Sequence, residues 1–205
     1  AEIEALKHGV AQFYPMLEGY PVLSEEASRF VKNFMDVDIR PEGIIPTVGA
    51  MQASYVAFMA LTECHKGKDT ILFIDPGFPV QKTQLEVIGK PYQTFDIYEY
   101  REEKLEAKLR EYLDRGNIAG IVYSNPNNPS WVCLTDFELQ VIGKLATEYD
   151  TIILEDLAYF AMDFRKDLGC PFEPPYQASV ARYTDNYIMQ ISGSKAFSYA
   201  GQRIG

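Results

Sequence analysis

The chemistry that this sequence could perform is concentrated in residues 191–205, which read ISGSKAFSYAGQRIG. Lys195 stands among small residues and hydroxyl groups, and Arg203 follows eight positions later. A lysine held in a crowded, partly apolar turn tends to lose its proton, because burial disfavours the charged form. The neutral amine can then attack an aldehyde and form a Schiff base. The hydroxyls of Ser192 and Ser194, together with the forked guanidinium of Arg203, could hold a phosphate nearby.

Taken alone, this stretch also fits a solvent-exposed glycine- and serine-rich loop, since short motifs recur by chance. A second candidate is Gly49 in PTVGAMQA, which stands between a short apolar strand predicted at residues 44–45 and a long helical pattern. The first turn of a helix has unpaired N–H groups at the positive end of the helix dipole, and these suit a phosphate. An ordinary strand–turn–helix connection accounts for the glycine at least as well.

Three further loops carry side chains that could bind a ligand. In NPNNP, prolines restrict the backbone around Asn127 and Asn128 and could aim their amides, although the same sequence also makes a stable turn. Asp156 ends a strongly apolar stretch and needs a partner if it is buried, and Tyr159 lies three residues later. An aspartate that only caps a helix is the alternative. Phe78 in DPGFP would either present an aromatic face beside the sheet or belong to the core.

The composition limits the classes of protein to consider. With 205 residues, 47% of them hydrophobic, the chain is long enough for one globular domain or slightly more. A net charge of −10 without any basic run argues against a nucleic-acid partner. No apolar run is long enough for a membrane span, and no signal-peptide pattern is present. Three scattered cysteines and two histidines predict neither disulfides nor a metal site. We therefore expect a cytoplasmic protein, unless a signal sequence precedes this numbering.

Strand-like apolar runs alternate with helical patterns along the chain. Strands are predicted at residues 44–45, 70–74, 92–95, 118–123, 151–154 and 187–191. Helices are predicted at residues 24–34 with Ser24 as N-cap, from Gly49 to before Gly67, and at 81–88, 102–113 and 135–149. The last of these helices would begin with a capping box formed by Thr135 and Glu138. The residues predicted to face inward are Ala53, Val56, Ala57, Ala60, Leu61, Leu105, Leu109, Leu113, Phe137, Val141, Ile142, Leu145 and Tyr149.

This alternation indicates an α/β domain with a mostly parallel sheet flanked by helices. In such sheets, ligands bind at the carboxyl ends of the strands. The loops after Ile45, Ile74, Tyr123 and Leu154 all follow predicted strands, and so does the turn that carries Lys195. We therefore expect five loops to build one shared site.

The ordered set GAMQA, DPGFP, NPNNP, EDLAY and SGSKxxxxxGxR resembles the fold-type I pyridoxal-phosphate enzymes, specifically the class I/II aminotransferase family. Each motif is short, but the combination is specific and extends over nearly the whole chain. The resemblance implies the large, cofactor-binding domain of the aspartate aminotransferase-like fold, with pyridoxal 5′-phosphate as cofactor. It also implies an enzyme that transfers an amino group between an amino acid and a 2-oxo acid.

The resemblance further implies a role for each matching residue. Lys195 would form the Schiff base and move a proton, and Asp156 would pair with the ring nitrogen. Tyr159 and Asn128 would hydrogen-bond the ring's phenolic oxygen, and Phe78 would stack on the ring. The phosphate would be held by Gly49, Ala50, Met51, Ser192 and Arg203.

Tyr14 matches a tyrosine that reaches the neighbouring subunit's phosphate in the family, which implies a homodimer with a shared active site. Residues 1–21 would then form an N-terminal segment at the dimer interface, and residues 22–205 the large domain. The family's C-terminal small domain, with the arginine that binds the substrate carboxylate, has no counterpart in this sequence, so the large domain would be incomplete at its C-terminus.

Some residues depart from the family pattern and leave the reaction open. Ser130-Trp131 stands where Thr-Gly is usual, which puts the shape of the substrate pocket in doubt. Val48 replaces a frequent hydroxyl residue, and residues 164–178 could form an extended loop over the site. The same scaffold also serves C–S lyases and synthases. A third interpretation is a cofactor-sensing domain of a transcriptional regulator, but residues 1–12 are too few for a DNA-binding module.

Overall fold

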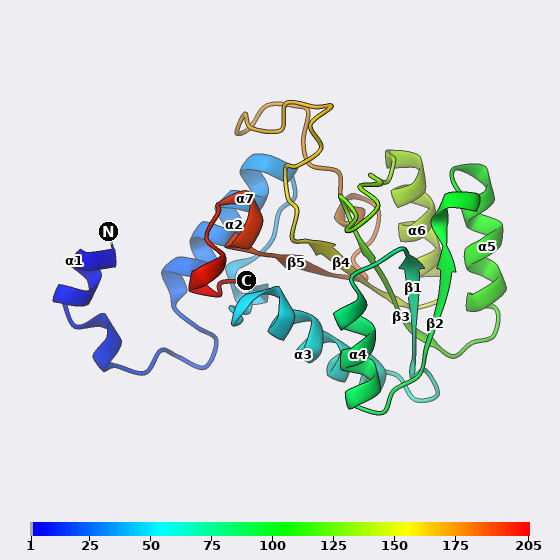
Figure 1. Ribbon diagram of the computed structural model, residues 1–205, viewed down its shortest axis with the longest axis horizontal. Helices are drawn as coiled ribbons and strands as arrows, with labels where there is room; N and C mark the ends of the chain where they lie inside the picture. The colour runs from blue at the N-terminus through cyan, green and yellow to red at the C-terminus, as the bar shows by residue number, and fades with distance from the viewer. Residues whose placement is uncertain (1) are drawn as a thin grey trace.

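The computed structural model describes residues 2–205, which form a five-stranded sheet with helices on both faces (Figure 1). The strands lie in the order β2–β1–β3–β4–β5, and every neighbouring pair is parallel. Their bounds are β1 Thr70–Asp75, β2 Tyr92–Asp96, β3 Ile118–Ser124, β4 Ile152–Leu157 and β5 Tyr187–Ile191. The predicted α/β class is confirmed. Strand β4 continues past the predicted end, so Asp156 lies within the strand.

Seven α-helices and five short 3₁₀ turns surround or precede the sheet within the described residues. The helices are α1 Glu2–Lys7, α2 Pro21–Met35, α3 Gly49–Cys64, α4 Pro79–Val87, α5 Glu103–Leu113, α6 Asp136–Glu148 and α7 Gly193–Ala196. The 3₁₀ turns are η1 Val10–Gln12, η2 Pro41–Gly43, η3 Ile97–Glu99, η4 Val180–Arg182 and η5 Ala200–Gln202.

The predicted start of the first long helix is wrong, and so is the strand predicted before α3. Helix α2 begins at Pro21 and not after Ser24, because proline suits the first helical position, where its missing N–H is not needed. Ser24 is instead buried inside the helix. Residues 44–45 form no strand, and the segment before α3 makes an isolated bridge between Val48 and Ile204.

Alternate side chains of the strands supply two separate hydrophobic clusters, one on each face of the sheet. From β1, Leu72 and Ile74 pack with α5 and α6, whereas Ile71 and Phe73 pack with α3 and α4. Helix α2 covers the β5 edge, where Val31 and Met35 belong to a third cluster. This three-layer arrangement leaves the carboxyl ends of the strands as one continuous edge.

The inward faces of the helices are predicted in part. The three leucines of α5 are fully buried, as expected from their spacing. In α3, however, Val56 and Ala60 are exposed, and the buried face is Ser54, Ala57, Phe58, Leu61 and Thr62. This helix is apolar around most of its circumference, so the periodicity alone did not define the buried side. In α6, Phe137 is exposed and Leu139 takes the inward place.

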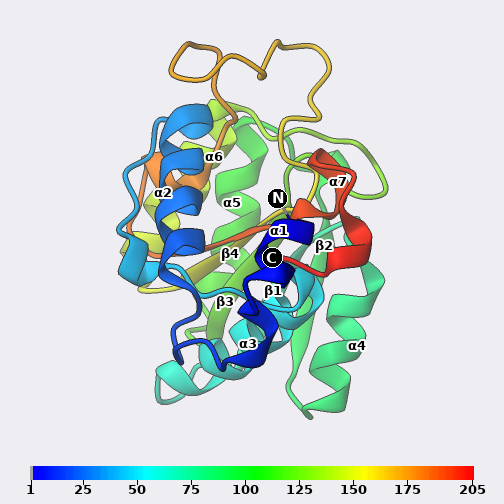
Figure 2. The same ribbon diagram turned by 90° about the vertical axis from the view of Figure 1, so that its left-hand side faces the viewer.

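Two segments extend from this body. Residues 2–20 lead away from the sheet in Figure 1, and Tyr14 and Leu17 are fully exposed. The long loop after β4 rises above the body in both views (Figure 1, Figure 2), and it is anchored to α2 by backbone hydrogen bonds from Phe172 to Asn33 and from Gln177 to Phe34. No helix within residues 2–205 combines the length and apolar character needed to cross a membrane.

Candidate active site

Four of the five predicted loops follow strands and meet at the carboxyl edge of the sheet: those after β1, β3, β4 and β5. The fifth, which leads into α3, arrives differently. Thr47 N donates to Gly205 O at 2.7 Å, and Gly205 N donates to Thr47 O at 3.2 Å. Gly193 N donates to Ile204 O at 3.2 Å, so the segment 203–205 lies between the first turns of α3 and α7.

The start of α3 offers two amides to an anion. Gly49 adopts a left-handed φ of 71°, which favours glycine. The amide of Val48 donates to Gln52 Oε1 at 2.6 Å, and the amide of Gly49 donates to Thr47 O at 2.8 Å. The next two amides, those of Ala50 and Met51, donate to no acceptor within the described residues. They are the unpaired N–H groups of a sixteen-residue helix, at the positive end of its dipole.

The guanidinium of Arg203 lies against this helix start. A Cβ atom on Gly49 would overlap it, so the missing side chain leaves the space that the guanidinium occupies. Arg203 Nη1 donates to Ala200 O at 3.0 Å, which leaves the remaining N–H groups available. A planar cation beside two unpaired amides is an arrangement that fits a phosphate group.

Ser192 and Lys195 lie on the turn after β5, and this turn is joined to residues 203–205 through the Gly193 amide. Ser192 is buried and caps α7, accepting from Ser194 N at 3.1 Å and donating to Ser194 Oγ at 3.0 Å. Lys195 itself is exposed. The prediction of a crowded apolar turn around the lysine is therefore wrong for this chain, because α7 is a single turn on the surface of the described residues.

Asp156 is the buried carboxylate of the site, with 6% of its surface exposed. Its Oδ2 accepts from Gln81 Nε2 at 3.0 Å, and its Oδ1 accepts from the Ala158 amide at 2.9 Å. Burial raises the pKa of Asp156 to about 6, although both hydrogen bonds act to lower it. In the register of β4 and β5 its neighbour is Gln190, whose Oε1 is buried without a partner among the described residues. Sequence reasoning expected a partner for Asp156 but did not identify either glutamine.

Phe78 and Asn128 together line a cleft of about 660 Å³ beside the loop after β1, and the side chains of Asp156, Lys195 and Arg203 lie outside its lining. Phe78 is the N-cap residue of α4. The backbone N–H of Asn128 donates to Ser124 Oγ at 3.3 Å. The neighbouring Asn127 has a structural role, because its Nδ2 donates to Pro76 O at 2.6 Å and so joins the loops that follow β1 and β3.

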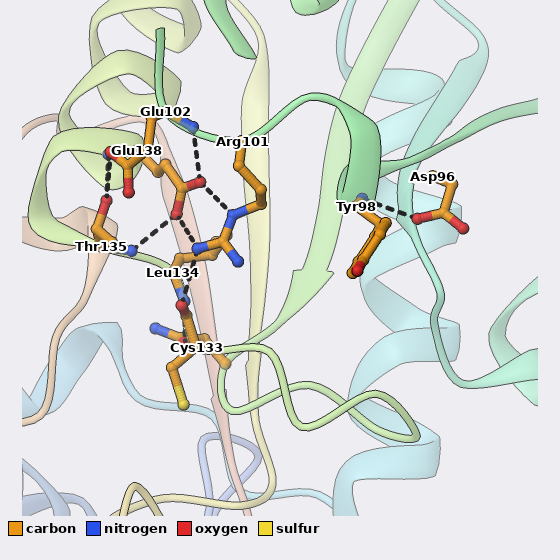
Figure 3. A network of polar contacts seen from close by, with 9 residues as sticks. Asp96, Tyr98, Arg101, Glu102, Cys133, Leu134, Thr135 and Glu138 are labelled. Carbon is orange, nitrogen blue, oxygen red and sulfur yellow. Dashed lines mark hydrogen bonds and ion pairs between the residues drawn. The ribbon is translucent and has the colours of Figure 1, made fainter. Parts of the chain in front are cut away.

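A network centred on Glu138 holds the far end of the loop that carries Asn128 (Figure 3). Glu138 is fully buried and completes the predicted capping box with Thr135. Its Oε2 accepts from Arg101 Nη2 at 2.7 Å, and Arg101 Nη2 also donates to Cys133 O at 3.2 Å. Burial opposes the charged form, but hydrogen bonds from Arg101 and from two amides keep the pKa of Glu138 below its usual value.

Tyr159 lies beside the unusual Trp131. The two rings are 5.6 Å apart in an edge-to-face arrangement, and Trp131 also stacks on Phe164 at 6.1 Å. Trp131 has a φ of 59°, a left-handed conformation in which glycine is favoured. Tyr14, by contrast, is fully exposed on the N-terminal segment and does not join the other candidate residues.

A second buried acid, Glu155, points to the opposite face of the sheet. It accepts from Tyr123 Oη at 2.9 Å and from the Val180 amide at 3.1 Å, and it also bonds Ser179. Burial raises the pKa of Glu155 to about 7. In the sequence it is only the first letter of EDLAY, and its place on the face opposite Asp156 follows from the alternation of side chains along β4.

Comparison with known proteins gives a consistent result. The family model described as aminotransferase class I and II matches residues 1–205. An aspartate aminotransferase of Pyrococcus horikoshii is 29% identical over 204 residues, and an asparagine–oxo-acid transaminase of Streptococcus mutans is 24% identical over 206 residues. These matches cover 98% and 100% of this chain, but 49% and 50% of the relatives. The chain thus spans about half the length of the curated relatives it matches.

Solved structures show the same fold. The alanine aminotransferase of Pyrococcus furiosus superimposes with a TM-score of 0.80 at 24% identity, covering 99% of this chain and 49% of that one. An aminotransferase of Mycobacterium tuberculosis gives a TM-score of 0.79 at 20% identity, with 99% and 49% covered. At this level of identity the likeness establishes the arrangement of elements, and the roles of individual residues need their own argument.

Proposed function

Because this chain belongs to the class I and II aminotransferase family, we propose that it is the cofactor-binding part of an enzyme that transfers an amino group between an amino acid and a 2-oxo acid. Members of the family depend on pyridoxal 5′-phosphate. The observation that carries the proposal is the pairing of a phosphate-type cradle at Gly49 and Arg203 with the buried Asp156 on the same sheet edge. The phosphate of this cofactor needs hydrogen-bond donors such as those at Gly49 and Arg203, and its ring nitrogen needs a buried acid such as Asp156.

The residues present fit the phosphate end of the cofactor. The unpaired amides of Ala50 and Met51 would donate to phosphate oxygens, and Arg203 would add a charge-assisted pair of hydrogen bonds. Ser192 would donate through Oγ once its hydroxyl hydrogen turns from Ser194 Oγ to the phosphate. The left-handed Gly49 allows the backbone and the guanidinium to approach one another at this point.

The residues also fit the ring. When bound, the ring accepts the electrons left behind as a proton leaves the substrate α-carbon. Asp156 would hold the proton on the ring nitrogen, and a cationic N–H would in turn favour the ionised carboxylate. Asn128 and Tyr159 would donate to the phenolic oxygen, and Phe78, which lines the cleft beside Asn128, would cover one face.

Lys195 would bind the cofactor covalently through Nζ and carry the proton from the substrate α-carbon. Its exposure is compatible with this role, since an accessible amine can reach both cofactor and substrate. We further propose that Tyr14 and residues 1–21 contact a second copy of the chain, where the exposed Phe13, Met16 and Leu17 would be covered. Residues 22–205 would form the large domain. A cytoplasmic location stays a prediction.

The proposal is tested by incubating the purified protein and pyridoxal 5′-phosphate with a panel of amino acids and measuring the 2-oxo acid released. We expect one oxo acid per cofactor without an acceptor, and continuous turnover when a second oxo acid is added. Lys195→Ala should lower turnover by about 10³-fold or more while the circular dichroism spectrum is unchanged. Lys66→Ala, at the opposite edge of the sheet, serves as the control. Release of ammonia or a thiol, or normal turnover in Lys195→Ala, would contradict an aminotransferase.

A further inference from the structure

Helix α4 carries two glutamines, Gln81 and Gln84, one turn apart on its inward side. Their exposed fractions are 4% and 9%, and a buried amide is costly unless its donors and acceptor are paired. Neither belongs to a motif identified in the sequence. Each is bonded to a different part of the candidate site.

Gln81 serves the end of the site that holds Asp156. Its Nε2 donates to Asp156 Oδ2 at 3.0 Å, and both side chains are buried. The backbone amide of Gln81 donates to Phe78 O at 3.2 Å, so Phe78 and Gln81 are joined by one tight turn at the start of α4. The position of Phe78 beside the cleft and the position of the Asp156 carboxylate are therefore set by the same turn.

Gln84 serves the opposite end, at the first turn of α3. Its Nε2 donates to Met51 O at 2.8 Å, and its Oε1 accepts from Ser54 Oγ at 2.8 Å. Ser54 is fully buried, and its hydroxyl also lies 3.2 Å from Met51 O. The turn of α3 that presents the unpaired amides of Ala50 and Met51 is thereby fixed to α4.

We propose that α4 is the element that sets the spacing between the two ends of the cofactor site, with Gln81 positioning Asp156 and Gln84 positioning the amides of Ala50 and Met51. The inference rests on the proposed function, because it takes the ligand to be a pyridine ring that carries a phosphate. Neither glutamine is a catalytic residue, since each acts through a neighbour.

Because of its surroundings, the protonation state of Asp156 depends strongly on the side-chain amide of Gln81. The groups that face this carboxylate are Gln81 from α4, Gln190 from β5 and the Ala158 amide, and all three are neutral. No charged side chain of the described residues contributes to its pKa. A glutamine donates at every pH, so it favours the carboxylate form without adding a titration of its own.

The first test replaces Gln81 by Met, which keeps the length of the side chain but removes the donor. In the cofactor-free protein, ¹³C NMR of the carboxyl groups, with Asp156 assigned by Asp156→Asn, should show its titration about one pH unit higher. Gln81→Glu should move it further, because two adjacent carboxyl groups cannot easily ionise together. An unchanged midpoint in both variants would overturn the role of Gln81.

The second test measures ligand affinity through quenching of Trp131, the single tryptophan of the chain, which lies against Tyr159. Gln84→Met should reduce the preference for pyridoxal 5′-phosphate over pyridoxal by about tenfold, because the phosphate amides lose their support. Its affinity should keep the pH dependence of the unmodified protein. Gln81→Met should keep the preference for pyridoxal 5′-phosphate over pyridoxal. It should instead raise the pH below which the cofactor binds weakly, in step with the higher titration midpoint of Asp156.

These results separate the inference from the function on which it rests. If the unmodified protein binds no pyridoxal 5′-phosphate, the proposed function fails, while the NMR titration still decides whether Gln81 controls Asp156. If the cofactor binds but the two variants affect pH dependence and phosphate preference equally, the division of roles along α4 is wrong. If Gln81→Met does not fold, Gln81→Glu preserves the shape and supplies the same measurement.

Discussion

The ionised form of Asp156 lowers the free energy of unfolding as long as no positive group lies against the buried carboxylate. Its pKa of about 6 compares with a usual value of 3.8, so the folded chain binds a proton more tightly than the unfolded chain. A group with a raised pKa in the folded state adds stability below its unfolded pKa, and this stability is lost as the pH rises through the folded pKa. Stability of the cofactor-free protein should therefore fall between about pH 4 and pH 6 because of this one residue.

Asp156→Asn should remove that cost. In the cofactor-free protein at pH 8, we expect the free energy of unfolding to rise by up to about 3 kcal/mol, with little change at pH 4. Affinity for pyridoxal 5′-phosphate should fall at the same time, since a neutral amide cannot balance the positive charge of a protonated ring nitrogen as a carboxylate would. Urea unfolding at the two pH values checks the first effect. Equal stability of both proteins at pH 8 would mean that burial of the ionised carboxylate does not lower the free energy of unfolding.

At the scale of residues, the sequence identifies the reactive groups better than their surroundings. Asp156, Arg203 and Asn128 are expected from loop positions and short motifs, and the fold brings these loops to one edge. The exposure of Lys195 and the support from Gln81 could not be expected, because both depend on how α7 and α4 pack. A useful signal for Gln81 is an amide three residues after Phe78, on the apolar side of a helix.

At the scale of elements, the start of α3 is the most constrained junction. Gly49 combines a left-handed backbone with direct contact to the Arg203 guanidinium. At the other end of the same helix, Gly67 is also left-handed, with φ of 89°, but a Cβ there would meet no atom within 4 Å. A side chain at either glycine would strain the backbone, but only a side chain at Gly49 would also collide with Arg203.

Gly49→Ala and Gly67→Ala should have unequal effects. Both should lose roughly 1 kcal/mol of stability, because alanine is unfavourable in the left-handed region. Only Gly49→Ala should displace Arg203, and we expect its affinity for pyridoxal 5′-phosphate to fall more than tenfold while Gly67→Ala binds normally. Equilibrium titration by Trp131 fluorescence, together with thermal unfolding, measures both. Equal affinities in the two variants would remove Arg203 from the phosphate site.

The elements that could be predicted are those with a strong local pattern. Five of the six predicted strands form. The three central ones, β1, β3 and β4, are apolar runs bounded by turns, and such runs are buried between two helix layers. The pair Ile44-Ile45 fails as a strand since two residues have no neighbour to pair with. The buried face of α3 was misassigned at Val56 for the opposite reason, because apolar residues lie all around that helix.

At the scale of the whole molecule, the parallel order of the strands gathers loops distant in sequence onto one edge. The order itself, with β2 outermost and β1 next to β3, cannot be read from a single sequence because any parallel order satisfies the same local patterns. The isolated bridge between Val48 and Ile204 joins residues far apart in the sequence, so it cannot be predicted from local patterns either. This bridge brings Arg203 to the start of α3.

The location of the covalently bound cofactor is the most direct test of the site around Lys195. The purified protein is incubated with pyridoxal 5′-phosphate, reduced with borohydride, digested and analysed by mass spectrometry. We expect one labelled peptide, which contains Lys195, and no such label in Lys195→Ala. Labelling of Lys82, which lies beside Phe78 in the cleft, or equal labelling of several surface lysines, would contradict the assignment of the site.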